Sequence, residues 1–126
     1  MSPHTRLLNA ILTSAPPKVR LFRNDQGYVE SVKGHHITYG LLPGSGDLIG
    51  WTSIRGQAIF TSVEVKAGKD RVRPKQADWV QSVLAAGGIA IVCRSVEEFL
   101  AQHGIQERSF SNGIAGASPF GVLRNM

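Results

Sequence analysis

The longest β-strand candidate in the chain reads AIFTSVEVK over residues 58–66. Its content of Ile, Phe, Thr and Val favours an extended conformation. Side chains alternate between the faces of a strand, so Glu64 and Lys66 share one face while Val63 and Val65 share the other. The Cα atoms of Glu64 and Lys66 are about 7 Å apart at a rise of ~3.3 Å per residue. A carboxylate and an ammonium therefore project from the end of a strand that is otherwise suited to burial.

A helix and a second strand follow this segment. Pro74 begins the helix, and Gly87-Gly88 supplies its C-terminal stop. Residues 89–93 form a continuous apolar run, which is typical of a strand buried on both faces. The order strand, helix, strand implies a right-handed crossover between two parallel strands. The buried face of the helix is formed at helical spacing by Gln76, Trp79, Val80, Val83 and Leu84.

A further helix is expected at the start of the chain. Ser2 caps it, Pro3 occupies its first position, and Pro16-Pro17 ends it. Its apolar face is formed by Leu7, Leu8, Ile11 and Leu12.

Strands and a glycine-rich loop are expected between this helix and residue 58. Residues 19–23 and 28–32 predict a β-hairpin around a short polar turn. Residues 34–46 contain four glycines and are expected to be mostly loop. Residues 47–51 form a short, largely apolar strand that opens with Asp47.

The last part of the chain predicts one more helix. Ser95 with Glu98 three residues later forms a capping box, and the helix is expected to reach about His103. We expect one domain over residues 1–104 and a partly mobile C-terminal tail over residues 105–126. The elements together predict a mixed α/β fold in which helices flank a central mixed sheet.

The composition is that of an ordinary globular domain with a basic surface. The chain has 126 residues, of which 42% are hydrophobic and 18% charged, a profile that argues against disorder. A net charge of +5 favours association with a polyanion, of which nucleic acid is the commonest. The sequence shows no apolar run near the ~20 residues of a membrane-spanning helix, no secretory signal, and a single cysteine. We expect a cytoplasmic protein that does not bind membranes.

Asp47 and Glu64 are the acidic residues that suggest chemistry. Asp47 follows Gly44-Ser45-Gly46, which lets the backbone approach a ligand closely. Hard cations such as Mg²⁺ bind oxygen, usually from one or two carboxylates with water and substrate phosphate. Asp47 and Glu64 on adjacent strands would supply two carboxylates, and the Val65 carbonyl would supply a third oxygen. Lys66 would position the attacking water and stabilise charge on the phosphate.

Simpler interpretations stay open for each of these residues. Asp47 alone is typical of a turn at a strand end. Glu64 and Lys66 alone suit a solvent-facing pair on an edge strand. Gln76 lies where an apolar residue would be expected, so it can orient a water molecule or hold Lys66, but it is also an ordinary polar residue for the first turn of a helix.

The loop between this strand and the next helix is basic. Its four basic residues predict phosphate contacts, although a solvated loop is the ordinary explanation of such a run: Lys69, Arg71, Arg73 and Lys75. His35-His36 are adjacent in an extended segment and face opposite ways, so a shared metal is not expected, although both could contact phosphate. Cys93, Trp51 and Trp79 are expected in the core.

Several of these segments resemble a known family. They are Arg23-Asn24, Tyr39-Gly40-Leu41, Gly44-Ser45-Gly46-Asp47-Leu48-Ile49-Gly50, Val63-Glu64-Val65-Lys66, Gln76 and Gly87-Gly88. In order and spacing they are similar to the virus-type replication-repair nuclease domain, VRR-NUC, of the PD-(D/E)xK nuclease superfamily. The resemblance covers residues 19–100, most of the chain.

The resemblance implies a restriction-endonuclease-like core and a structure-selective DNA endonuclease that uses Mg²⁺, with Mn²⁺ as a substitute. It makes Asp47 and Glu64 metal ligands, Lys66 the catalytic lysine and Gln76 a supporting polar residue. Arg23 joins the four basic loop residues as a DNA-binding candidate. Small stand-alone members, often phage-encoded, are similar to Holliday-junction resolvases and act as homodimers, since a two-fold symmetric junction requires two active sites. Such a member would act in the bacterial host cell.

Two departures from the family pattern are visible. Gly46 occupies the position where the family has proline, and the first helix has no acidic residue to supply the helix-borne metal ligand of some relatives. The alternatives are a flap- or restriction-type nuclease and a non-catalytic DNA-binding protein, and the complete acid–acid–lysine set argues against the second. A nucleotide-phosphate site is excluded because no Gly-Lys-Ser/Thr follows Gly44-Ser45-Gly46.

Overall fold

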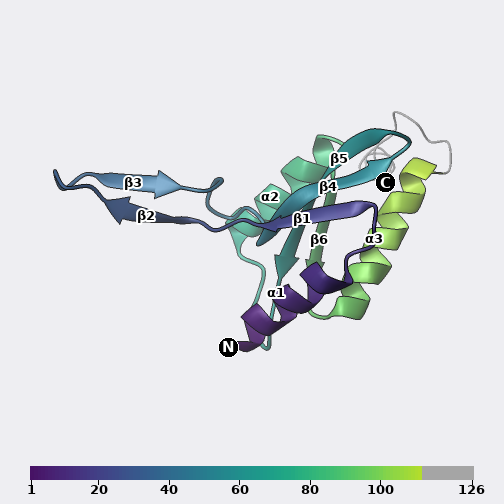
Figure 1. Cartoon of the computed structure of the whole chain (residues 1–126), viewed down its shortest axis with the longest axis horizontal. Coiled ribbons are helices and arrows are strands. Elements are labelled where there is room, and N and C mark those ends of the chain that lie inside the picture. The colour runs from purple at the N-terminus through teal and green to yellow at the C-terminus, as the bar shows by residue number, and fades with distance from the viewer. Residues whose placement is uncertain (112–126) are drawn as a thin grey trace.

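The computed structural model describes residues 1–111, and within them it contains three helices and six strands (Figure 1). In chain order the elements are α1 (Pro3–Ser14), β1 (Val19–Arg23), β2 (Gly27–Glu30), β3 (His36–Tyr39), β4 (Leu48–Ile54), β5 (Gln57–Val65), α2 (Pro74–Ala85), β6 (Ile89–Cys93) and α3 (Val96–Ser111). In this described part of the chain, each helix is too short or too polar to cross a lipid bilayer.

Four strands form the central sheet in the order β1-β4-β5-β6. β4 is antiparallel to β1 and β5, whereas β5 and β6 are parallel, so the predicted mixed sheet and the parallel strand–helix–strand unit are confirmed. Adjacent residues of β5 face different helices. Thr61 bonds to Thr52, which bonds to His103 of α3, while Ser62 accepts a hydrogen bond from Trp79 of α2. α2 therefore covers one face of the sheet, and α3 with α1 covers the other (Figure 1).

The main core lies between the sheet and the helices α1 and α3. Ile11 of α1, Leu48 of β4 and Phe99 of α3 are fully buried in it. α1 begins as predicted, because the Ser2 hydroxyl accepts a hydrogen bond of 3.1 Å from the backbone N–H of Thr5. The helix is thus capped at its first turn and anchored by apolar packing further along.

α3 is longer than the sequence predicts. The apolar pattern underestimates its length because part of the side that faces the sheet is polar. It continues beyond His103, its expected end, and Gln102 and Gln106 donate hydrogen bonds of 2.8 Å to backbone oxygens of β6. These amides form hydrogen bonds with backbone groups on the open edge of β6, which would otherwise be unpaired. The first part of the predicted tail, residues 105–111, is therefore helical, and residues 112–126 lie outside the described part of the chain.

The predicted hairpin of residues 19–32 is wrong. β1 pairs with β4, and β2 pairs with β3 in a separate two-stranded sheet. β3 lies within residues 34–46, which the sequence predicts to be mostly loop. Asn24 explains the difference, because its backbone N–H donates to the Asp47 carbonyl at 2.9 Å. The chain therefore leaves β1 alongside the start of β4 instead of turning back on itself.

The β2–β3 hairpin projects from the rest of the molecule (Figure 1). It begins where β1 ends and returns where β4 starts, so its base lies at the end of the central sheet where these strand ends meet. Its exposed apolar side chains are Val29, Val32, Ile37 and Tyr39. A two-stranded sheet is only marginally stable in water by itself, so this apolar hairpin is a surface suited to contact with another molecule.

Candidate active site

Asp47 and Glu64 meet where β4 begins and β5 ends, at the same end of the central sheet from which the hairpin projects. Leu48, the first residue of β4, lies opposite Val63 of β5, and the same register sets Asp47 opposite Glu64. Asp47 Oδ2 accepts a hydrogen bond of 2.7 Å from the backbone N–H of Val65. The backbone of β5 thus fixes one oxygen of the Asp47 carboxylate next to Glu64.

The loop before Asp47 is held from two sides. The side-chain amide of Asn24 donates hydrogen bonds of 2.8 Å to the Ser45 hydroxyl and to the Gly46 carbonyl. A Cβ atom added at Gly46 would collide with the hydroxyl of Ser62 on β5. Glycine at position 46, where the family pattern has proline, therefore lets the loop pack directly on β5 and brings Asp47 to the site. Asn24 is a positioning residue that sequence analysis missed.

Glu64 is buried and is hard to ionise when no cation is present. Its relative exposure is 5%, and its pKa is raised from 4.5 to about 8 by burial, then by the negative charge of Asp47 and a hydrogen bond with it. Lys66 opposes this shift but does not cancel it. Two carboxylates held this close form an oxygen-rich pair that a divalent cation would neutralise. The residues present therefore fit Mg²⁺ or Mn²⁺.

Gln76 connects the acid to the lysine. Its Oε1 accepts a hydrogen bond of 2.7 Å from Lys66 Nζ and one of 2.9 Å from the backbone N–H of Arg73, while its Nε2 donates to Glu64 Oε1 at 3.0 Å. Lys66 Nζ also lies 3.8 Å from Glu64 Oε1. Lys66 is 5% exposed and follows a central strand, so the interpretation of Glu64 and Lys66 as a solvent-facing pair on an edge strand is wrong.

These side chains line one polar pocket of about 340 Å³. Its lining residues are His4, Asp47, Glu64, Val65, Lys66, Asp70, Arg71, Arg73 and Gln76. Of the basic candidates, Arg71 and Arg73 border the pocket, and Lys69 and Lys75 are exposed close to it in sequence. Arg23 lies at the end of β1, where it pairs with Asp25 at 3.7 Å. Arg94 supports the loop by donating to the carbonyl oxygens of Gly68 and Asp70.

His4 is a site residue that the sequence analysis missed. Its Nε2 lies 3.4 Å from Asp47 Oδ2, although the two residues are 43 positions apart in the chain. The first helix lacks an acidic residue, as noted from the sequence, but it places this imidazole in the pocket instead. The available signal was the helical stripe itself, since His4 lies one turn before Leu8 on the same side of α1.

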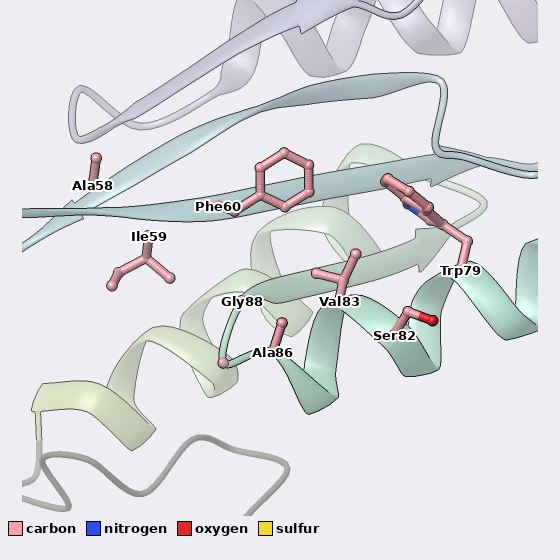
Figure 2. A pocket seen from close by; sticks show the side chains of 9 residues that line it. Ala58, Ile59, Phe60, Trp79, Ser82, Val83, Ala86 and Gly88 are labelled. Carbon is pink, nitrogen blue, oxygen red and sulfur yellow. The ribbon is translucent and has the colours of Figure 1, made fainter. Parts of the chain in front are cut away.

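A second pocket is mostly apolar. Figure 2 shows it between β5 and α2, with Phe60, Trp79 and Val83 directed toward it. None of the nine described residues that line it is titratable, so it offers no group for acid–base or metal chemistry. Trp79 is half-buried there, but the prediction that Trp51 lies in the core is wrong, because Trp51 is 43% exposed on the sheet.

The remaining candidates lie elsewhere. Cys93 is buried in the core as predicted, and burial raises the pKa of its thiol to about 12, so it is unsuited to act as a nucleophile. His35 and His36 are exposed on the hairpin. Within residues 1–111, no three His, Cys, Asp or Glu side chains already form a complete metal-binding group. A cation at Asp47 and Glu64 would therefore need backbone, water or phosphate oxygens as well.

The helix-flanked mixed sheet, with two carboxylates and a lysine at its strand ends, is compatible with a nuclease fold. Residues 29–97 match the family model of the VRR-NUC domain. This match covers more than half of the chain, so the chain belongs to the VRR-NUC family, and the resemblance seen in the sequence is confirmed. The protein is accordingly a nuclease with DNA as its substrate. No match is found among curated proteins or among solved structures.

Proposed function

We propose that the chain is a divalent-cation-dependent, structure-selective DNA endonuclease that resolves four-way junctions as a homodimer. The observation that carries this proposal is the cluster of Asp47, Glu64, Lys66 and Gln76 in one pocket. Nuclease chemistry needs negative charge to be stabilised as water attacks phosphorus and the bond to the leaving oxygen breaks. The Lys66 ammonium would meet that requirement together with a cation held by the two carboxylates.

Asp47 and Glu64 would hold the cation through carboxylate oxygens, with the Val65 carbonyl as a third ligand. Bound Mg²⁺ or Mn²⁺ would supply Lewis-acid stabilisation of the charge that gathers on the phosphate. The unfavourable pairing of the two carboxylates supports this assignment, because Glu64 otherwise keeps a proton up to about pH 8. A hard cation replaces that proton with a stronger positive charge.

Lys66 is held ready for the phosphate. The amide of Gln76 fixes its ammonium at 2.7 Å, and burial leaves few other positions for it. In this arrangement Lys66 positions the attacking water and offsets the charge of the transition state. Gln76 holds the side chains of Lys66 and Glu64 in place relative to each other. Arg71 and Arg73, which border the pocket, would contact phosphates on either side of the cut.

The junction and the homodimer are supported by symmetry and by the hairpin. A four-way junction presents two equivalent strands to cut, and one chain has one such pocket in its described part. The exposed apolar residues Val29 and Ile37 lie opposite each other on the projecting hairpin, whose charged residues are Glu30 and Lys33. A nearly neutral, apolar arm suits a second copy of this basic chain better than it suits phosphate.

The test is cleavage of labelled junction, flap, splayed and duplex DNA with Mg²⁺, Mn²⁺ or EDTA. We expect paired cuts in the junction with either metal and none with EDTA. Glu64→Gln should abolish cleavage while preserving DNA binding, and Glu97→Gln, at an exposed position of α3, should leave both unchanged. Cleavage by the Glu64 variant at the wild-type rate would refute the site. A monomer on junction DNA in sedimentation would refute resolution and leave a flap- or restriction-type nuclease.

A further inference from the structure

His4 lies on the side of α1 that packs against the sheet. His4, Leu8 and Ile11 follow one another at the i, i+4, i+7 spacing of a single helix face, and Leu8 and Ile11 are buried in the core. The capped first turn, in which Ser2 accepts from Thr5, holds the start of the helix in place. The imidazole is therefore presented to the pocket by a packed helix and not by a loose terminus.

Two donors converge on one oxygen of Asp47. The backbone N–H of Val65 donates to Oδ2 at 2.7 Å, and His4 Nε2 contacts the same atom at 3.4 Å. An ionised carboxylate only accepts hydrogen bonds, so Nε2 carries the hydrogen in this contact. Both donors act on Oδ2, and neither occupies Oδ1.

We infer that His4 is a positioning residue for Asp47, which it holds by Oδ2 together with the Val65 N–H so that Oδ1 is presented to the divalent cation. The inference goes beyond the proposed function and rests on it, since Asp47 must be a metal ligand. Groups that orient a metal-ligating carboxylate typically change metal affinity by about 10- to 100-fold when they are removed. α1, distant in sequence from the two strand ends, is in this way part of the metal site.

Direct coordination by His4 is the competing arrangement, and the geometry favours positioning. His4 Nε2 is already engaged with Asp47, and the described His, Cys, Asp and Glu side chains form no ready group of three around a metal position. A direct ligand would have to give up the contact with Asp47 and turn its ring. A positioning residue keeps the contact that the structure shows.

The experiment titrates the full-length, metal-free protein with Mn²⁺ and measures free Mn²⁺ by electron paramagnetic resonance, without DNA. We expect His4→Ala to weaken Mn²⁺ binding about tenfold. His4→Gln, which keeps an N–H donor at a similar reach, should restore affinity to within about threefold of wild type. Thr13→Ala, at the exposed far end of α1, should bind as wild type does, and circular dichroism should show every variant folded.

Each result decides between the possibilities. Wild-type affinity in His4→Ala overturns the inference, and the proposed function stands if Asp47→Ala still loses the metal. A nitrogen coupling to bound Mn²⁺ that is present in wild type and absent in both His4 variants overturns it in favour of direct coordination. Absence of Mn²⁺ binding in wild type overturns the proposed function itself. Tight binding restored by His4→Gln alone supports positioning.

Discussion

Replacing Glu64 with Gln tests the electrostatics of the site in the metal-free protein. The pKa of Glu64 is raised from 4.5 to about 8, chiefly by burial and then by Asp47. The folded state therefore keeps a proton that the unfolded chain releases between these two values. The stability contributed by protonated Glu64 is fully present below pH 4.5 and is lost as the pH rises through about 8. An amide at position 64 does not titrate, so the variant should escape this loss.

The size of the effect follows from the two pKa values. At ~1.4 kcal/mol for each pKa unit, the change from 4.5 to about 8 sets an upper limit of about 5 kcal/mol on the stability that wild type loses. Relaxation of the site and entry of water reduce this, so we expect the variant to gain about 2–4 kcal/mol over wild type by pH 9. In a chain of this size such a gain corresponds to a rise in Tm on the order of 10 °C.

The assay is urea unfolding of wild type and Glu64→Gln in EDTA at pH values from 5 to 9. The difference between the two free energies of unfolding isolates Glu64 together with its coupling to Asp47 and Lys66, because groups outside this cluster titrate alike in both proteins. We expect a difference near zero at pH 5 that grows through pH 8, and Glu97→Gln should give a flat line. Mn²⁺ at pH 8 should stabilise wild type strongly and the variant little. A difference independent of pH would refute the assignment of the raised pKa to Glu64.

Three further changes test the surroundings of the site. Gln76→Leu removes the amide that holds Lys66, so kcat should fall about 10- to 100-fold with KM for DNA nearly unchanged in steady-state cleavage, and an unchanged kcat would contradict the role given to the amide. Gly46→Ala should lower the free energy of unfolding in urea by about 1–3 kcal/mol through the added Cβ, whereas equal stability would show that the loop adapts. Arg71→Ala combined with Arg73→Ala should weaken DNA binding and lower the slope of log K against log salt by about 2 in fluorescence anisotropy, and an unchanged slope would remove both from the phosphate contacts.

The parts of the fold that the sequence predicts correctly depend on local information. Alternation along residues 58–66 places Glu64 and Lys66 on one face, and the short spacing to the next helix and strand leaves only a parallel crossover. Gln76 stands out because a polar residue interrupts an apolar stripe, and the structure joins it to both Glu64 and Lys66. In each case the signal lies within one or two elements.

The parts that the sequence does not predict depend on partners far along the chain. The strand of residues 19–23 has the composition of a hairpin strand, and nothing local shows that its partner is β4 and not β2. The length of α3 is not predicted, because the hydrogen bonds of Gln102 and Gln106 are made to β6 and no local pattern shows them. His4 is an ordinary helix residue until α1 packs beside Asp47.

Burial of Glu64 links the fold to the proposed metal dependence. The strand register that sets this carboxylate opposite Asp47 also removes it from water, so the folded chain must neutralise it with a proton or with a cation. Proton and cation therefore compete for the same oxygens, and apparent metal affinity should increase with pH up to about 8 and level off above it. A solvent-exposed pair of acids would gain little from a cation at neutral pH, because water already stabilises both charges. The same packing that makes the metal-free site unfavourable thus supplies the free energy with which it would bind the cation.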